Sequence, residues 1–328
     1  MRAYDLTSYN FFVKEMILAA IDIGTNTFRL LIAEVSPGQW KDSILFREIH
    51  SERIITRLGE GLSENFLLNK ESMERGIEAL RQFSKLIDKH KSEKVLAVAT
   101  GALRKARNSA EFIMSAKDSA GIKIEIISGE KEAELTAAGM VMDIERPGSC
   151  LMVDIGGGST ELIFTGANAS LTLQSLDLGV VYLAEKLMKS DPPSKTDLAL
   201  LGKEISNSLE TVQEDFMRMI TPETLFMGTA GTITALAAAV QHLEKYDHEK
   251  IHKYTMHIAD IKKIYTEMSA ITATERSKFL PFEPSRLDII VPGTLILLRL
   301  MSNFKLNEIL VSNYGLREGI LAELYQRA

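Results

Sequence analysis

Several features that mark particular classes of protein are scarce in this chain of 328 residues. Its single cysteine, Cys150, cannot form an intrachain disulfide, and this fits a reducing, cytoplasmic setting. No apolar run reaches the roughly 18 residues that cross a bilayer, so we expect no membrane partner. Lysine and arginine number 38 against 44 acidic residues, and the resulting net charge of −6 argues against a DNA-binding protein.

The residue patterns of thiolate zinc sites and of covalent catalysis are missing as well. The six histidines show no HxH spacing, although one HExxH spacing occurs at His248-Glu249-Lys250-Ile251-His252, and one thiol cannot build a thiolate zinc site. The sequence also contains no GxSxG elbow and no Ser–His–Asp order. These absences argue against a single-residue covalent nucleophile.

The composition that remains is that of a globular protein. Hydrophobic residues make up 45% of the chain and charged residues 25%, and the length allows two domains. Residues 1–15 lack the basic and long apolar regions of a signal peptide. They precede Met16, where we expect the first strand to begin, and we interpret them as an upstream extension.

The chain contains one internal repeat. Residues 21–30 (IDIGTNTFRL) align with residues 153–162 (VDIGGGSTEL), an offset of 132 residues (153 − 21). Asp, Ile, Gly and Leu recur in place, and each copy reads as a strand, a tight turn and a second strand. We therefore expect two halves of similar topology. The first domain is expected at 16–145, joined by a C-terminal helix at 316–328, and the second at 146–315.

Strands alternate with helices along most of the chain, which predicts an α/β fold. The apolar residues of 70–89 recur at helical spacing. Asn108 with Glu111 resembles a capping box that opens another helix, and Gly121 ends it. Further helices are expected at 130–142, 180–189, 196–219, 231–240, 259–269, 291–301 and 316–327, and strands at 94–100, 122–127, 151–155, 161–165, 171–177 and 224–228.

Four glycine-containing turns follow predicted strands. Small residues let backbone N–H groups approach and cradle phosphate oxygens, and the hydroxyls of Thr25 and Ser159 add donors. A lone turn of this kind is more often only a turn, but four of them, two preceded by Asp, favour phosphate handling. They are Asp22-Ile23-Gly24-Thr25-Asn26, Thr100-Gly101-Ala102-Leu103-Arg104, Asp154-Ile155-Gly156-Gly157-Gly158-Ser159 and Gly228-Thr229-Ala230-Gly231-Thr232.

Four carboxylates are candidates for chemistry. Asp22 and Asp154 sit where predicted strands end, and each could hold hydrated Mg²⁺, which prefers one or two carboxylates plus substrate phosphates. Their alternative role is to cap a turn. Glu132 and Glu161 are the acid–base candidates, because hydrolysis of a phosphoanhydride needs an oriented water. Three acids lie within 130–134, so the sequence cannot choose among them, and a solvated helix face is the alternative.

A small basic cluster, Arg104-Lys105-Ala106-Arg107, precedes a predicted helix. Planar guanidinium groups suit phosphate oxygens. Arg29, Arg53 and Arg57 could join this cluster across a cleft, although solvation at the surface explains such residues equally well.

The motifs form an ordered series along the chain. It consists of AIDIGTNTFRLLIAEV (20–35), RLGEGL (57–62), ATGALRKARN (99–108), EIISGEKEAE (125–134), VDIGGGSTELIF (153–164), LDLGVVYL (176–183) and MGTAGTITAL (227–236). Together these segments resemble the exopolyphosphatase/guanosine pentaphosphate phosphatase family, Ppx/GppA. The DIGTN, DIGGGSTE and GTAGT elements are highly specific in combination, and the chain looks like the short form of the family.

The resemblance implies the two-domain fold of the actin/Hsp70/sugar-kinase superfamily, with an inter-domain cleft. It places the family's catalytic glutamate at Glu132 and its phosphate-binding arginine at Arg104, with Arg107 as a further candidate. Family members usually carry Arg where this chain has Glu134. The positive charge of that Arg is absent here, which leaves open how the phosphate chain is bound. The family's two loops fall on Asp22, Gly24, Thr25 and Asn26 and on Asp154, Gly156, Gly157, Gly158, Ser159 and Glu161.

The sequence and the resemblance together favour a Mg²⁺-dependent exopolyphosphatase that removes terminal phosphate from inorganic polyphosphate. A guanosine pentaphosphate or nucleoside-triphosphate phosphohydrolase is the alternative enzyme. The motifs indicate contacts with phosphate groups, and they do not identify the chemical group to which the phosphates are attached. A polyphosphate- or alarmone-binding protein with little turnover is the alternative of another class. Asp22, Asp154 and Glu161 would hold the metal, and Gly228 and Gly231 would belong to the phosphate-binding turns. The resemblance also suggests a homodimer.

Overall fold

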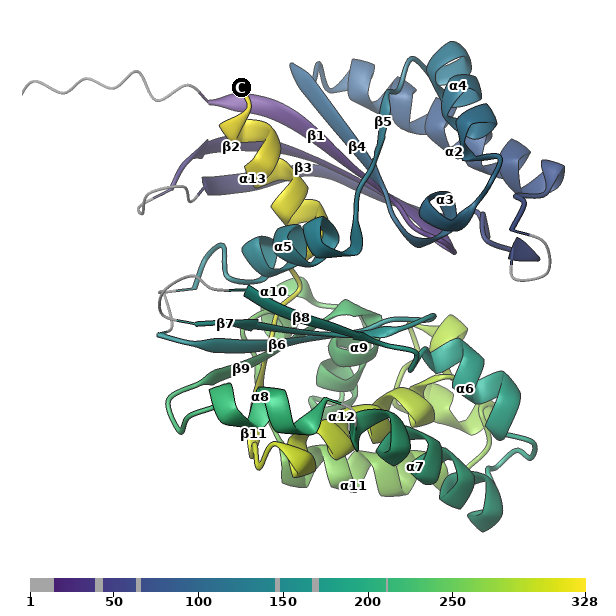
Figure 1. Cartoon of the computed structure of the whole chain (residues 1–328), viewed down its shortest axis with the longest axis vertical. Coiled ribbons are helices and arrows are strands. Elements are labelled where there is room, and N and C mark those ends of the chain that lie inside the picture. Colours follow the sequence, from purple (N-terminus) through teal and green to yellow (C-terminus); the bar gives the residue numbers. More distant parts are fainter. Residues whose placement is uncertain (1–14, 39–43, 63–65, 145–147, 167–170, 211) are drawn as a thin grey trace, which may run out of the picture. The chain divides into compact units, whose positions relative to one another are not determined.

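The computed structural model describes residues 15–38, 44–62, 66–144, 148–166, 171–210 and 212–328. The expected extension up to residue 14 and the expected domain boundary at 145–146 lie outside these residues. The chain forms two compact units, one made of the residues up to Leu135 with Leu316–Ala328 and the other of Thr136–Gly315 (Figure 1). Each unit has its own mixed sheet and its own hydrophobic core.

The first unit is built on a five-stranded sheet. Its strands are β1 (Met16–Ile23), β2 (Thr27–Pro37), β3 (Ile44–Ile55), β4 (Lys94–Ala99) and β5 (Ile124–Ile126). They follow the order β3-β2-β1-β4-β5, in which β1 pairs antiparallel with β2 and parallel with β4. β1 is buried along nearly its whole length, as expected of an apolar strand that is covered on both faces.

The helices of the first unit begin and end at recognisable signals. They are α2 (Lys70–Lys89), α3 (Gly101–Lys105), α4 (Ser109–Ala120), α5 (Gly129–Met140, which continues into the second unit) and α13 (Leu316–Gln326). α2 begins after Asn69, whose side chain accepts a hydrogen bond from the backbone N–H of Ser72 (2.7 Å). α4 ends at Gly121, whose φ of 68° is easily adopted by glycine.

The predicted capping box at the start of α4 was wrong. The Asn108 side chain makes no cap hydrogen bond. It binds both backbone groups of Leu68 instead, accepting from its N–H (2.9 Å) and donating to its carbonyl (3.1 Å). The side-chain amide of Asn108 therefore forms tertiary hydrogen bonds instead of the helix cap that the local sequence pattern predicted.

The second unit is built on a six-stranded sheet. Its strands are β6 (Cys150–Ile155), β7 (Thr160–Thr165), β8 (Leu171–Leu176), β9 (Leu225–Thr229), β10 (Thr255–His257) and β11 (Glu308–Val311). They follow the order β10-β11-β9-β6-β7-β8. β6 pairs antiparallel with β7 and parallel with β9, so this sheet is mixed as well.

The helices of the second unit are α6 (Val180–Leu187), α7 (Lys195–Glu210), α8 (Gln213–Met219), α9 (Ala230–Val240), α10 (His248–Ile251), α11 (Ile258–Ser269), α12 (Ile290–Asn303) and the 3₁₀ turns η1 (Thr274–Lys278) and η2 (Pro284–Arg286). The single helix predicted at 196–219 is therefore two helices, α7 and α8. Val212 lies between them and is buried, with 2% exposure and a φ of −117°.

The internal repeat of the sequence is also a repeat of topology. In each unit an antiparallel meander (β1-β2-β3 or β6-β7-β8) has a parallel strand (β4 or β9) beside its first member. The register agrees as well, since Asp22 pairs with Arg29 in the first unit and Asp154 pairs with Glu161 in the second. The expectation of two halves with similar topology is confirmed.

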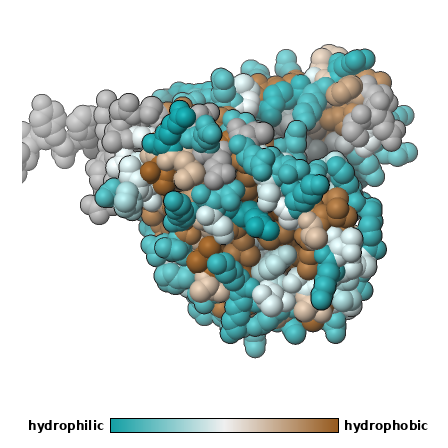
Figure 2. Space-filling view, turned by 60° about the horizontal axis from the view of Figure 1, so that its bottom comes forward, coloured by the Kyte–Doolittle hydropathy of each residue, from teal (hydrophilic) through white to brown (hydrophobic). Residues whose placement is uncertain are grey.

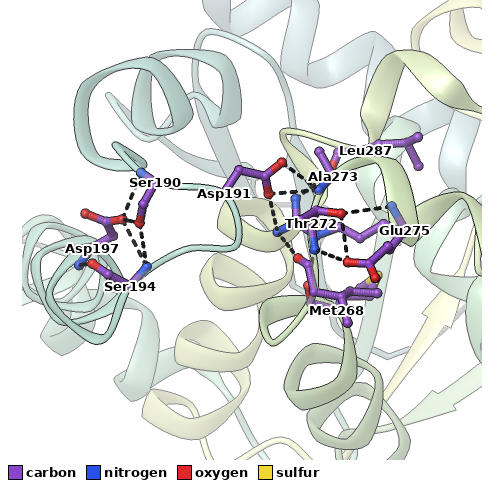
Figure 3. A network of polar contacts seen from close by, with 11 residues as sticks. Ser190, Asp191, Ser194, Asp197, Met268, Thr272, Ala273, Glu275 and Leu287 are labelled. Atoms are coloured by element: carbon purple, nitrogen blue, oxygen red, sulfur yellow. Dashed lines mark hydrogen bonds and ion pairs between the residues drawn. The ribbon is translucent and has the colours of Figure 1, made fainter.

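Polar contacts fasten the loops of the second unit (Figure 3). The Asp197 carboxylate accepts from the Ser190 hydroxyl (2.6 Å) and from the Ser194 backbone N–H (3.1 Å), and these hydrogen bonds lower the pKa of Asp197 to about 2. Asp191 accepts from the Ala273 backbone N–H (2.8 Å). Each acid thus binds backbone groups of a loop, which is a structural role.

Hydrophilic residues cover most of the face shown in Figure 2, and hydrophobic residues appear there as separate patches. Within the described parts of the chain, no helix is both long and apolar enough to cross a membrane.

Candidate phosphate-handling site

The first Asp-Gly turn joins β1 to β2. The Gly24 N–H donates to the Thr27 carbonyl (3.1 Å), and a Cβ at Gly24 would lie 2.9 Å from the same oxygen, so the turn requires glycine. The Asn26 carbonyl accepts from the backbone N–H groups of Thr56 (3.0 Å) and Arg57 (2.9 Å). The segment after β3 therefore holds this turn in place.

Thr25 connects this turn to a second glycine turn. A Cβ at Gly101 would lie 2.9 Å from the Thr25 hydroxyl oxygen, and one at Gly59 would overlap the Thr25 methyl group. Gly101 opens α3, which carries Arg104. The structure thus brings two of the four predicted turns together within the first unit.

Asp22 lies at the end of β1 and is only 5% exposed. Arg29 Nη1 is 3.4 Å from Asp22 Oδ2. Burial raises the pKa of Asp22, the charges of Arg29 and Arg317 oppose that rise, and Glu318 adds to it. Arg53 is the cross-strand partner of Arg29, so the two arginines extend a polar row from Asp22 across the sheet. A Mg²⁺ ion at Asp22 would share its carboxylate with Arg29.

Arg317 and Glu318, at the start of α13, are site neighbours that sequence reasoning missed. Arg317 donates to the Ser51 hydroxyl on β3 (2.8 Å) and to Glu318 Oε1 (3.3 Å). Glu318 is 3% exposed, which is unusual for a carboxylate. Two charged residues at the first turn of α13, directly before the apolar residues 319–322, were the signal that could have found them.

Arg104 and Glu132 form an ion pair in the first unit. Arg104 Nη1 lies 3.0 Å from Glu132 Oε2 and also donates to the Ile127 carbonyl (3.0 Å). The two side chains are 34% and 31% exposed, so a solute can reach them. Glu134 pairs with Lys131 instead (3.0 Å). The structure therefore distinguishes Glu132 from its acidic neighbours as the one that contacts the basic cluster.

Arg107 has different surroundings from Arg104. Its backbone N–H donates to the Phe66 carbonyl (2.8 Å), and its guanidinium carbon lies 5.7 Å from the centre of the Phe66 ring. These contacts keep Arg107 beside the segment that precedes α2. Its role as a phosphate ligand stays a prediction.

The Gly156–Ser159 turn repeats the geometry of the first turn. The Gly156 N–H donates to the Ser159 carbonyl (2.9 Å), as Gly24 does to Thr27. Gly157 and Gly158 are exposed. Their backbone N–H groups are of the kind that cradles phosphate in such turns.

The first residues of α6 hold this turn in place by binding the carbonyl groups of the turn. The Val180 and Val181 N–H groups donate to the carbonyls of Gly156 and Gly157, each at 3.1 Å. A Cβ at Gly179 would overlap the Gly157 carbonyl, so the two segments need glycine where they touch. The motif at 176–183 therefore supports the turn.

Asp154 and Glu161 lie side by side on the second sheet. They are cross-strand partners on β6 and β7, which puts their Cβ atoms about 5 Å apart on one face. Thr229 on β9 and Ser175 on β8 continue the row, and Glu161 Oε1 accepts from the Ser175 hydroxyl (3.0 Å). No group of three His, Cys, Asp or Glu side chains that could hold a metal occurs among the described residues. Mg²⁺ needs only one or two carboxylates plus phosphate oxygens, and this pair fits that need.

The two glycines of the last turn have different environments. A Cβ at Gly228 would lie 2.6 Å from Ile309 Cδ1, so Gly228 serves packing inside the sheet. A Cβ at Gly231 would overlap the guanidinium of Arg286. Arg286 therefore lies directly on this turn, and its Nε is 3.4 Å from Glu283 Oε1. Sequence reasoning missed Arg286 because it comes 55 residues after Gly231 (286 − 231).

Comparisons with known proteins agree with this arrangement. A family model described as the Ppx/GppA phosphatase family matches residues 31–328. The chain is 31% identical over 321 residues to "Exopolyphosphatase 2" of Mycobacterium tuberculosis (strain CDC 1551 / Oshkosh), covering 94% of this chain and 98% of that protein. It is 27% identical over 305 residues to a "Guanosine-5'-triphosphate,3'-diphosphate pyrophosphatase" of Aeromonas salmonicida (strain A449), covering 93% of this chain and 58% of that protein.

A solved structure shows the same fold. The crystal structure of the Aquifex aeolicus member of the Ppx/GppA protein family has 32% sequence identity and a TM-score of 0.82, covering 96% of this chain and 99% of that chain. The match of the family model over most of the chain and this structural likeness lead to one conclusion. The chain belongs to the Ppx/GppA phosphatase family and has its two-domain, actin-like α/β fold.

Proposed function

We propose that this protein is a Mg²⁺-dependent exopolyphosphatase, which removes the terminal phosphate of inorganic polyphosphate. The observation that carries the proposal is the pair of Arg104 and Glu132, with nitrogen and oxygen 3.0 Å apart and both side chains accessible. Hydrolysis of a phosphoanhydride needs positive charge at the transferred group and an oriented water, and this pair offers both. The M. tuberculosis relative, which is similar over nearly its full length, is named an exopolyphosphatase.

Glu132 would orient the attacking water and accept its proton as the new P–O bond forms, while the P–O bond to the next phosphate breaks and the shortened polyphosphate leaves with the bridging oxygen. Arg104 uses Nη1 for its contacts with Glu132 and Ile127, and its guanidinium has further N–H donors on Nε and Nη2. Those donors would bind oxygens of the terminal phosphate. The exposed Gly157 and Gly158 would bind phosphate oxygens through their backbone N–H groups.

Asp154 and Glu161 would hold Mg²⁺ in the second unit, and Asp22 is the candidate ligand in the first unit. The ion would neutralise negative charge on the phosphates. The adjacent carboxylates on β6 and β7 support this assignment more strongly than Asp22, because Arg29 already pairs with Asp22.

Guanosine pentaphosphate is the second candidate substrate. The Aeromonas salmonicida relative is named for a guanosine triphosphate–diphosphate substrate, and it is similar across 93% of this chain. The turns and arginines described above contact phosphates through backbone N–H and guanidinium groups. Such contacts do not distinguish a polyphosphate chain from a nucleotide.

The test is phosphate release from long polyphosphate, short polyphosphate, guanosine pentaphosphate and ATP, each with Mg²⁺ and each with EDTA. We expect the highest kcat/KM on polyphosphate, with loss of activity in EDTA. A higher kcat/KM on guanosine pentaphosphate would replace the first proposal by the second. Tight binding of any of these ligands without turnover would identify a binding protein and refute both.

The proposal includes a cytoplasmic location and a homodimeric state. A cytoplasmic enzyme agrees with a single cysteine, Cys150, that is free and buried. Burial raises the pKa of its thiol to about 12, so a reactive thiolate is not expected. The proposed assembly is a homodimer, and a monomer mass in multi-angle light scattering would refute it.

A further inference from the structure

Helix α5 carries two consecutive residues whose side chains have different partners. Glu132 contacts Arg104 of α3. Lys131 contacts Glu323 of α13, with Nζ 3.2 Å from Oε2, and Glu134 of its own helix, with Nζ 3.0 Å from Oε2. Consecutive residues of an α-helix project about 100° apart, so the two contacts hold different sides of α5.

The contact between Lys131 and Glu323 is part of a longer series of opposite charges, which we call the α5–α13 ion-pair chain (Glu134, Lys131, Glu323, Arg327 and Glu125). Glu323 Oε1 accepts from Arg327 Nε (3.1 Å) and lies 3.0 Å from Arg327 Nη2. Arg327 Nη1 reaches both oxygens of Glu125 (3.1 and 3.2 Å). The chain thereby links α5, α13 and β5.

The central pair of this chain is partly shielded from water. The Lys131 side chain is 33% exposed and that of Glu323 is 22% exposed. Desolvation opposes ionisation of both groups. The hydrogen bonds nevertheless raise the pKa of Lys131 and lower the pKa of Glu323, so both groups stay charged at neutral pH. An isolated surface ion pair does little, whereas a shielded pair inside a network restrains its helices more.

A backbone contact lies on the same side of α5. A Cβ at Gly319 of α13 would overlap the Leu135 carbonyl. Leu135 follows Lys131 by four residues, so the two share one face of α5. The close backbone approach limits the distance between the helices, and the ion pair limits the rotation of α5 about its axis. Figure 1 shows α13 as the terminal helix of the first unit, close to α5.

We propose that Lys131, held by Glu323, is a positioning residue that sets the rotation of the first turn of α5, so that the Glu132 carboxylate lies against Arg104. This inference rests on the proposed function, in which Glu132 orients the water. A displacement of about 1 Å at a catalytic group can cost roughly 10²-fold in rate. Lys131 acts here through Glu132, and it has no role in substrate binding.

The test removes the lysine charge but keeps the length of its side chain. Lys131→Met should lower kcat about tenfold while KM changes less than about twofold, because only the orientation of the base is lost. Glu323→Gln removes the same contact from α13 and should act in the same direction. Lys131→Arg should restore most of kcat. The matched control is Lys70→Met, which removes an exposed lysine that pairs with Glu74 on α2.

The decisive measurement repeats Lys131→Met in a Glu132→Gln background, with circular dichroism to confirm folding. If Lys131 acts through Glu132, the second substitution should lower kcat less than about twofold there. An equal loss in both backgrounds, an unchanged kcat in the wild-type background, or a rise in KM alone would overturn the positioning role. If Lys131→Met fails to fold, the same comparison with Glu323→Gln decides.

The two proposals fail in different ways. A Glu132→Gln variant that keeps its kcat refutes the water-orienting role and the positioning role with it. A Glu132→Gln variant that loses kcat, combined with a fully active Lys131→Met variant, refutes the positioning role alone.

Discussion

Identical side chains in the first unit have different roles because their neighbours differ. Glu132 meets a guanidinium at 3.0 Å, whereas Glu134, one half-turn further on, pairs with Lys131. Arg104 donates to a carboxylate and a carbonyl, while Arg107 stacks over the ring of Phe66. At the scale of residues, the neighbours of a side chain decide whether it is a candidate for catalysis, and its residue type alone does not.

Glu132→Gln keeps the size of the side chain but removes the basic oxygen. We expect kcat for phosphate release to fall by roughly 10²–10⁴, with KM little changed, because the water loses its proton acceptor. Glu130→Gln is the matched control and should cost far less; Glu134→Gln should also cost far less than Glu132→Gln, although Glu134 pairs with Lys131. If Glu132→Gln keeps more than about a tenth of kcat while Glu161→Gln abolishes it, the base is Glu161.

At the scale of elements, α13 supports a site to which it supplies no proposed catalytic residue. Its first turn places Arg317 and Glu318 near Asp22, and its later turns contact α5 through Gly319 and Glu323. A C-terminal helix of this kind belongs to the first unit although it comes last in the sequence.

Gly319→Ala should destabilise the protein. The added Cβ would overlap the Leu135 carbonyl, which is backbone and cannot move aside alone. We expect a loss of about 1–3 kcal/mol in the free energy of unfolding, measured by urea denaturation, although alanine favours helix by about 1 kcal/mol. Gly129→Ala is the control, because no atom lies within 4 Å of its Cβ position. An unchanged midpoint for Gly319→Ala would contradict the close contact between α13 and α5.

The stability that Glu323 contributes should depend on pH. Burial opposes the shift, but hydrogen bonds from Lys131 and Arg327 lower the pKa of Glu323 below its ordinary value of 4.5. A carboxyl whose pKa is lower in the folded state stabilises the fold above the unfolded pKa, and that contribution is lost as the pH falls through the folded pKa. Glu323→Gln should therefore lower Tm at neutral pH, with the difference shrinking below about pH 4. A Tm difference that is constant with pH would show that the charge is not its source.

At the scale of the whole molecule, one meander occurs twice with different charges in the same register. Asp22 has Arg29 as its cross-strand partner, whereas Asp154 has Glu161. The first row thus carries two arginines beside Asp22, whereas the second carries two carboxylates side by side. In the proposed function, the second row is therefore the better candidate for the metal.

Asp154→Asn should therefore raise the Mg²⁺ concentration needed for half-maximal activity, because one of two adjacent carboxylates loses its charge. Phosphate release is measured in a Mg²⁺ titration after treatment with EDTA. Glu249→Gln, on α10, is the control and should leave the titration unchanged. If Asp154→Asn lowers kcat at every Mg²⁺ concentration without moving the midpoint, Asp154 does not bind the metal.

The sequence by itself determined those features that depend on neighbours along the chain. The Asp-Gly turns at the ends of β1 and β6 follow from short strands and small residues, and their spacing revealed the duplicated topology. The motif series was enough to indicate the family and hence the fold. The end of α4 was likewise readable from Gly121, because capping is a local interaction.

Only the tertiary structure decided the features that depend on residues far apart in the chain. It separated Glu132 from the acids beside it, because Arg104 lies 28 residues earlier (132 − 104). It placed Arg286 on the turn at Gly231, and it gave the Asn108 amide to Leu68 instead of the helix cap. In each case the partner of a polar group is a residue far away in the sequence that folding brings close. A pattern of adjacent residues does not contain that information, because local hydrogen bonds compete with these tertiary contacts.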